Sequence, residues 1–303
     1  MKRGCVIGYD INEKGCQISY YDDSMEEPDT MMASSNNYLI PLVLGYFKDR
    51  WVFGKEAKRL AVVGEDCTET DLYGKAKRRE KVSLAGKTYD AVWLLAKYIS
   101  LTLQDFENIQ YLTFTTPETD VDMAKMLKGI GQHIGVDKEI INVQDYKESF
   151  CQYMIFQPKE LWQYESALFY CDEDRIKAYM LRRLRVDASH GMNSFVTVDE
   201  VANAQRKELE ALYPIMNKEK SPDESFKSMI ENVFEKKVIS SVYLTGEGFE
   251  KNWYPNSLRV LCNGRRAFMG NNLYSKGACY KSIRKCEPND DGPIYLDETK
   301  LTE

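Results

Sequence analysis

Metal-binding side chains are scarce in this chain of 303 residues. It contains only two histidines, His133 and His190, and none of its eight cysteines forms a C-x-x-C pair. A structural zinc site needs several such ligands at close spacing, so the sequence argues against one. Cysteines scattered in this way are typical of reduced, mostly buried thiols, and they favour a cytoplasmic protein.

Long apolar runs and an excess of positive charge are also missing. No run approaches the ~20 residues of a membrane-spanning helix, and the opening MKRGCVIGYD lacks the pattern of a signal peptide. The net charge of −6 provides no general attraction to nucleic acid or to anionic membranes. We therefore expect neither nucleic acid nor a membrane among the partners. The apolar content of 43 % is that of a globular protein.

Turn residues and periodic apolar residues predict an alternation of strands and helices. Hairpins are expected at 4–21, 38–54 and 167–184. Further strands are expected at 110–117, 139–144, 239–249 and 293–301. Helices are expected at 55–64, 90–109, 118–135, 197–216, 221–238 and 273–283, with Ser221 as a helix cap.

Two halves that each begin with a β-hairpin indicate a duplicated architecture. The pattern predicts an α/β fold with two hairpin-first cores in two lobes and a cleft between them. Lobe I is placed at 1–150 and lobe II at 151–286. The polar tail, 287–303, is interpreted as the start of a further region.

Six segments in sequence order resemble the actin-like ATPase superfamily, most closely the nucleotide-binding domain of heat-shock chaperones. The first phosphate hairpin of that family resembles VIGYDINEKGCQISYY. Two following chaperone segments resemble YLIPLVLGYFKDRWVFGKEAKRLAVV and LYGKAKRREKVSLAGKTYDAVWLLAKYIS. The next strand, helix and connection resemble YLTFTTPETDVDMAKMLKGIGQHIGVDKEIINVQDY. The adenosine motif and the closing helix are similar to SVYLTGEGF and YSKGACYKS.

This resemblance implies a two-lobed actin-like ATPase fold that binds ATP or ADP with Mg²⁺. Carried over position by position, it implies nucleotide-binding roles for Gly8, Asp10, Asn12, Lys14, Gly246, Gly248 and Lys276. It also implies three catalytic candidates: Asp10 to orient metal or water, Lys77 to contact the γ-phosphate, and Asp145 in place of a catalytic glutamate.

Each candidate also has an ordinary structural interpretation. Aspartate is a common turn residue at the end of a strand, which would account for Asp10. Lys77 lies in the charged run KAKRREK, and such runs are usually solvated faces. A lone G-x-G, here Gly246 and Gly248, also occurs in ordinary turns. Asp145 is followed by Tyr146, where the chaperones have proline.

The chain departs from the family where phosphate should bind. Glu13 lies in the first hairpin turn, and the second hairpin has Tyr170 where the family has an aspartate. Three carboxylates, 172–174, replace three glycines. Two like charges ~4 Å apart cost about 4 kcal/mol at an effective dielectric constant near 20, so a triphosphate would be repelled. The connection between 184 and 225 is also too short for the subdomain that grips adenine in the chaperones.

The departures favour a scaffold or regulatory binding protein with weak or no nucleotide binding and with a protein as its partner. An active Mg-ATP-dependent ATPase with an atypical site is the alternative, and a small-molecule kinase of the sugar-kinase branch is a third. The chain has twenty tyrosines, which form either core packing or an exposed aromatic surface for a partner. Lys77 and Arg79 mark a basic patch that would serve the same role.

Overall fold

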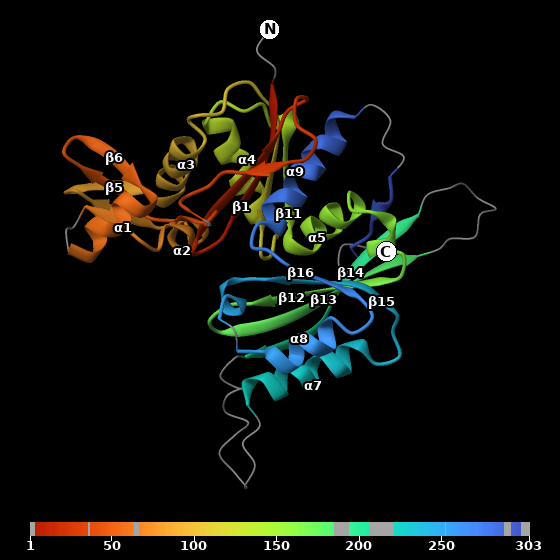
Figure 1. The fold of residues 1–303 in the computed structure, drawn as a ribbon. Coiled ribbons are helices and arrows are strands. Elements are labelled where there is room, and N and C mark those ends of the chain that lie inside the picture. The colour runs from red at the N-terminus through yellow and green to blue at the C-terminus, as the bar shows by residue number, and fades with distance from the viewer. Residues whose placement is uncertain are drawn as a thin grey trace. The chain divides into compact units, whose positions relative to one another are not determined.

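The computed structural model describes residues 4–35, 37–63, 67–184, 194–205, 221–251, 253–287 and 292–297. The chain divides into two units, each built on a mixed β-sheet with helices, which confirms the α/β class (Figure 1). Unit 1 comprises Met1–Ser149 and Tyr274–Asp290, and unit 2 comprises Phe150–Leu273 and Asp291–Glu303. The first boundary of the units, between Ser149 and Phe150, lies next to the division predicted after residue 150. The C-terminal helix, however, was assigned to lobe II, and nearly all of it belongs to unit 1.

The main sheet of unit 1 has the strand order β11-β10-β1-β2-β3, and a short strand β4 also pairs with β2. The hairpin β1–β2 and the pair β2–β3 are antiparallel, whereas β10 and β11 continue the sheet in parallel with β1. The strands span Cys5–Ile11 (β1), Gly15–Tyr21 (β2), Asp29–Thr30 (β3), Ile40–Pro41 (β4), Ile109–Thr116 (β10) and Ile141–Asp145 (β11). The predicted first hairpin is therefore confirmed.

The sheet of unit 2 repeats this arrangement with different residues. Its order is β16-β15-β12-β13-β14-β17, again with an antiparallel hairpin, a third antiparallel strand, and two further parallel strands beside the first. The strands span Glu165–Cys171 (β12), Arg175–Leu184 (β13), Phe195–Gln205 (β14), Ile239–Thr245 (β15), Arg266–Met269 (β16) and Ile294–Tyr295 (β17). Both units thus share one strand order and one set of directions without a visible sequence repeat.

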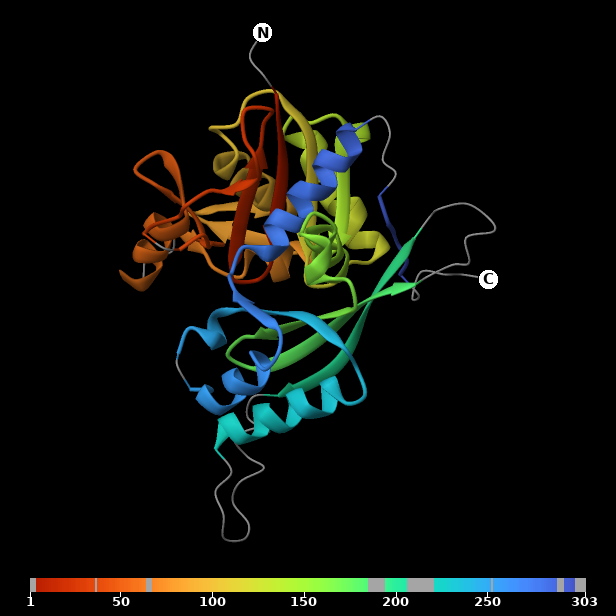
Figure 2. The same cartoon turned by 45° about the vertical axis from the view of Figure 1, so that its right-hand side comes forward.

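Helices cover both faces of β1, and this placement determines what surrounds Asp10. Ile7, Tyr9 and Ile11 enter the apolar core beside α3 and α4, and the Tyr9 hydroxyl bonds Thr102 of α3 at 2.8 Å. Successive side chains of a strand point to opposite faces, so Gly8 and Asp10 face α5 and α9 instead. These helices span Ala91–Thr102 (α3), Val121–His133 (α4), Tyr146–Ile155 (α5) and Leu273–Cys286 (α9; Figure 2).

Residues 44–90 of unit 1 form two small sheets, β6-β5-β7 and β8-β9, with two helices. The hairpin β5–β6 turns at Lys48 and Asp49, both with positive φ, as a right-handed strand twist favours in two-residue turns. This confirms the second predicted hairpin. The elements here are β5 (Leu44–Phe47), β6 (Arg50–Phe53), α1 (Gly54–Val63), β7 (Thr68–Glu69), α2 (Leu72–Lys77), β8 (Lys81–Leu84) and β9 (Lys87–Asp90).

Two helices pack on the sheet of unit 2. Phe226 and Ile230 of α7 (Pro222–Phe234) join Phe169 of β12 in its apolar core, which α8 (Pro255–Leu261) extends. Ser221 caps α7, as predicted, by accepting a hydrogen bond from the Glu224 backbone N–H at 3.4 Å. Single 3-10 turns occupy Lys138–Ile140, Lys159–Leu161 and Glu247–Phe249.

The predicted helix at 197–216 is wrong in the part that the structure describes. Residues up to 205 belong to β14, which pairs with β13 along its whole length, and the remaining predicted residues lie outside the described chain. Val196 and Val198 are buried, and an extended partner strand outweighs the modest helix propensity of the polar residues that follow. The predicted strand near the C-terminus is confirmed as the two residues of β17.

No helix in the described ranges is long and apolar enough to cross a membrane.

Candidate functional site

Asp10 ends β1 as a buried carboxyl group. Only 4 % of the residue is exposed, and one carboxylate oxygen accepts a hydrogen bond of 2.8 Å from the hydroxyl of Tyr146. Burial raises the pKa of Asp10 to about 7, because desolvation penalises the charged form, and the Tyr146 hydrogen bond partly opposes this rise. Asp10 therefore holds its proton to a higher pH than an ordinary aspartate does.

Tyr146 is the first residue of α5 and connects the start of that helix to the first hairpin. Its hydroxyl also accepts a hydrogen bond of 3.0 Å from the amide of Asn12. Its ring stacks on Tyr274 of α9 with centroids 3.7 Å apart. The resemblance places the proline of the chaperones at this position. Here a tyrosine instead provides a hydroxyl group that is already bonded to Asp10 and Asn12.

The turn of the first hairpin is closed by its own side chain. The Asn12 side-chain oxygen accepts hydrogen bonds from the backbone N–H groups of Lys14 at 2.9 Å and Gly15 at 3.3 Å. The Asn12 backbone N–H donates in turn to the Gly15 carbonyl at 3.0 Å. Such Asx turns are a common use of asparagine. The resemblance assigns the backbone N–H groups of this turn to phosphate, and here an amide oxygen takes that place.

The second hairpin, β12–β13, has the same closed turn. One carboxylate oxygen of Asp172 accepts hydrogen bonds from the backbone N–H groups of Asp174 and Arg175, each at 2.8 Å. The Asp172 N–H donates to the Arg175 carbonyl at 3.0 Å. Asn12 and Asp172 therefore occupy equivalent positions in the two units. Each satisfies two N–H groups that a bound anion would otherwise need.

Asp10 also belongs to a buried polar row across the sheet of unit 1. Strand register places Gln17, Asp10, Thr115 and Gln144 side by side on β2, β1, β10 and β11. Ser149 of α5 bonds the Thr115 hydroxyl and the Gln144 amide, each at 2.7 Å. The first turn of α5 therefore lies over this row.

Asp145 has a structural task in this arrangement. It is 6 % exposed, and its carboxylate accepts a hydrogen bond of 2.8 Å from the Glu148 backbone N–H. An acidic group at this position satisfies a free N–H of the first turn of α5 and interacts favourably with the helix dipole. Sequence reasoning did not predict α5. The signal that would have found it is D-x-x-E at 145–148, which resembles a capping box.

Gly8, the glycine assigned to nucleotide binding in unit 1, allows close packing of α9. A Cβ on Gly8 would lie 2.2 Å from both the Cys279 nitrogen and the Ser275 carbonyl oxygen. Gly277 has a similar role, since its Cβ would lie 2.0 Å from the Ser149 carbonyl oxygen. Lys276, the neighbouring candidate, has its ammonium group 3.8 Å from the Glu27 carboxylate. These contacts account for the residue types without a ligand.

Gly246 and Gly248, in unit 2, are likewise required by their own chain. Gly246 has φ +101°, and a Cβ there would lie 2.1 Å from the Cys171 carbonyl oxygen. A Cβ on Gly248 would lie 2.3 Å from the Cys171 sulfur. The Gly246 N–H donates to the Asn271 side-chain oxygen at 2.9 Å. The G-x-G sequence therefore lets the end of β15 pass close to the end of β12.

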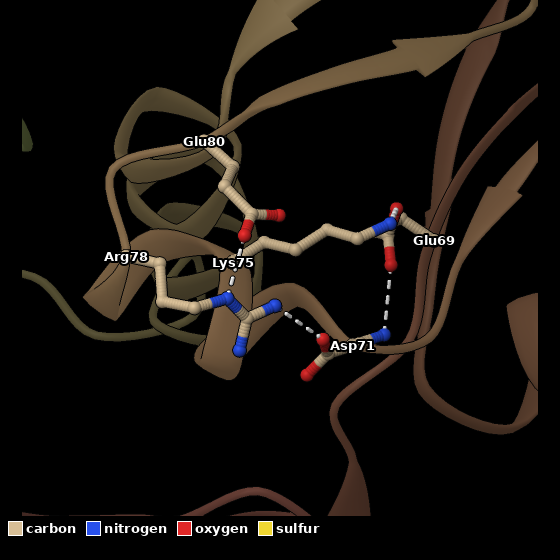
Figure 3. A network of polar contacts seen from close by, with 5 residues as sticks. All are labelled: Glu69, Asp71, Lys75, Arg78 and Glu80. Atoms are coloured by element: carbon tan, nitrogen blue, oxygen red, sulfur yellow. Dashed lines mark hydrogen bonds and ion pairs between the residues drawn. The ribbon is translucent and has the colours of Figure 1, made fainter.

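Lys77 is the last residue of α2. Figure 3 shows the ion pairs that its neighbours form. Lys75 pairs with Glu69 at 2.9 Å, and Arg78 bridges Asp71 at 2.9 Å and Glu80 at 2.6 Å. Lys77 and Arg79 are exposed and take part in none of the ion pairs found in the described part of the chain. Some side chains of the charged run KAKRREK are thus held in ion pairs, and the others are exposed to solvent.

The predicted site residues are only partly brought together. Asp10 and Asn12 meet at the hydroxyl of Tyr146, which the sequence did not single out. Lys77 contacts neither, and Gly246 and Gly248 belong to unit 2. The donor set does not fit Mg²⁺: within the described ranges no three acidic, histidine or cysteine side chains are grouped so that they could hold a metal ion, and the Asp10 carboxyl already binds Tyr146.

The family model described as "Family of unknown function (DUF5716) C-terminal" matches residues 27–298. Because this match covers most of the chain, the protein belongs to that family. No curated protein matches the chain.

Proposed function

We propose that this protein is a degenerate member of the actin-like ATPase superfamily that acts as a scaffold or regulatory binding protein, with weak or no nucleotide binding. The shared strand order of the two sheets supports the duplicated fold that the resemblance implies. The partner is a protein. The eight cysteines are all free, in keeping with a reducing compartment such as the cytoplasm.

The observation that carries this proposal is the pair of closed hairpin turns. Phosphate-binding loops hold anions with backbone N–H groups that point at the ligand. In both hairpins two such groups are bonded to Asn12 or to Asp172. A phosphate would have to break these hydrogen bonds, and in the second hairpin it would also approach a carboxylate. Both the geometry and the charge therefore disfavour nucleotide.

The contact between Tyr146 and Asp10 supports the same proposal. A metal-orienting aspartate must be ionised and open to a hydrated cation, but Asp10 is buried, has a pKa of about 7 and bonds a phenol. With the phenol in place, the carboxyl contributes to the packing of α5 on β1. Asp145 is committed to the same helix as its cap.

One observation favours the alternative, an active ATPase with an atypical site. A buried carboxyl group with a pKa of about 7 is suited to general base catalysis at neutral pH. In that alternative, Asp10 would activate water after Tyr146 had moved away from it.

Phosphate release distinguishes the two functions. Wild-type protein and Asp10→Asn are incubated with saturating Mg-ATP beside a heat-denatured sample. The asparagine side chain of the variant keeps an oxygen that accepts from Tyr146 but cannot act as a base, so the variant should fold. We expect all three samples to release phosphate at the same background rate. Turnover in the wild type that Asp10→Asn abolishes would establish the alternative.

A further inference from the structure

An open groove lies between α3 and α4 of unit 1, away from the candidate site. Both helices are labelled in Figure 1. Its volume is about 380 Å³, which is within the range of ligand pockets, ~300–1,000 Å³. The floor is apolar. It is formed by Val92, Trp93, Ala96, Met126 and Ile130, with Gly129 between them.

Gly129 leaves space that the protein itself does not use. A Cβ at this position would meet no atom within 4 Å, whereas a Cβ on the nearby Gly131 would lie 2.6 Å from the side chain of Ile141. Packing on β11 therefore explains Gly131 but not Gly129. Glycine in a helix costs about 1 kcal/mol relative to alanine, so Gly129 weakens α4 and in return leaves the groove open.

The rim of the groove is positively charged. Arg79 and Lys125 supply this charge beside His133, and no side chain of the three has a hydrogen-bond or ion-pair partner among the residues that the structure describes. The one acidic residue in the lining, Asp90, is engaged as the cap of α3 and accepts from the Val92 and Trp93 N–H groups at 2.8 and 3.1 Å. This cationic rim belongs to a chain with a net charge of −6.

Aromatic side chains extend the apolar surface beyond the groove. Trp93 is 38 % exposed and stacks on Tyr89 at 5.5 Å, and Trp51 meets both rings at 5.8 Å. Tyr46 continues the cluster at 5.1 Å from Trp51. Partly exposed aromatic residues are enriched where proteins bind one another.

We propose that this groove binds an acidic peptide segment of a partner protein. A bulky apolar side chain of the segment enters the space at Gly129, its neighbours contact Trp93, and its carboxylates pair with Arg79 and Lys125. Charge complementarity selects an acidic segment over a basic one. This inference rests on the proposed binding function and specifies its partner.

A phage-displayed library of random short peptides, selected on the purified full chain, tests the proposal. We expect enriched peptides to carry Phe, Leu or Trp beside several Asp or Glu residues. Fluorescein-labelled copies are then titrated by anisotropy against Gly129→Leu, which fills the groove and also improves helix propensity. Affinity should fall by about tenfold or more. Gln132→Leu places the same residue type on an exposed position of α4 outside the groove without adding bulk there, and this variant should bind as wild type does.

Charge reversal provides an independent readout. The double variant Arg79→Glu/Lys125→Glu should lose the acidic peptides and select basic ones from the same library, whereas Lys138→Glu should change neither result. A library without enrichment, or enriched peptides that bind Gly129→Leu as tightly as wild type, would overturn the groove proposal. Micromolar binding of ATP by the wild type would instead overturn the proposed function, so the two failures can be told apart.

Discussion

The Tyr146 hydroxyl donates a 2.8 Å hydrogen bond to the carboxyl group of Asp10, a residue 136 positions earlier in the chain. This contact joins the start of α5 to the end of β1 and keeps the carboxyl away from solvent. Asp10 lies where the resemblance places a metal-orienting aspartate. Its environment is instead that of a buried packing residue, and this has measurable consequences for stability.

Asp10 should make the protein less stable as pH rises. Its pKa is raised from 3.8 to about 7, so the folded state holds the proton more tightly than the unfolded state does. Its contribution is fully present below pH ~4, is lost between pH ~4 and ~7, and amounts to about 4 kcal/mol. Asp10→Asn cannot titrate. In urea unfolding, the variant should therefore gain stability over wild type by roughly that amount from pH 4 to pH 8. A difference independent of pH would refute the assignment.

The closed hairpin turns should contribute to folding. Asp172→Ala removes the two hydrogen bonds that its carboxylate accepts from backbone N–H groups and should cost about 1–2 kcal/mol of unfolding free energy. Asn12→Ala should cost more, because Asn12 also donates to Tyr146. Glu13→Ala and Glu173→Ala, at exposed positions of the same turns, are the matched controls and should change stability by less than about 0.5 kcal/mol. If all four variants changed the free energy of unfolding in urea equally, the hydrogen bonds that Asn12 and Asp172 make to their turns would not contribute to stability.

Gly8 should be required for packing, independently of any ligand. A Cβ there would clash with the backbone of α9, which cannot move without separating from β1. Gly8→Ala should therefore reduce the free energy of unfolding by about 2 kcal/mol or more. Gly129→Ala, the same change at an open position in α4, should raise it by up to about 1 kcal/mol. If Gly8→Ala were as stable as wild type, packing would not explain this glycine, and ligand binding would again be the better interpretation.

Local sequence signals predicted much of the fold. Asn12 to Gly15 is a turn sequence between two β-rich runs, which predicts the first hairpin. Ser221 precedes Pro222 and an acidic first turn, which predicts the start of α7. Both elements could therefore be predicted from neighbouring residues. The helix α5 was missed because its aromatic residues suggested general core packing. The strand β14 was missed because its polar sequence is held extended by β13, a partner that local propensity does not reveal.

The candidate site was less predictable because it depends on distant contacts. A resemblance can align Asp10 with a family position, but it cannot show that Tyr146 folds back onto the carboxyl group. It also cannot distinguish a glycine that leaves room for a ligand from one that leaves room for a packed helix, as Gly8 does for α9. The departures at 170–174 predict a poor phosphate site from residue types alone, because like charges repel, and this stays a prediction.

The most direct test of the central claim is a calorimetric titration of Mg-ATP into the wild-type protein and into Asp10→Asn at neutral pH. The closed turns and the Tyr146 contact predict no saturable heat with either protein, which corresponds to a Kd weaker than ~1 mM. Micromolar binding by the wild type that is lost in Asp10→Asn would contradict the account, because it would show that Asp10 is open to a nucleotide-bound cation.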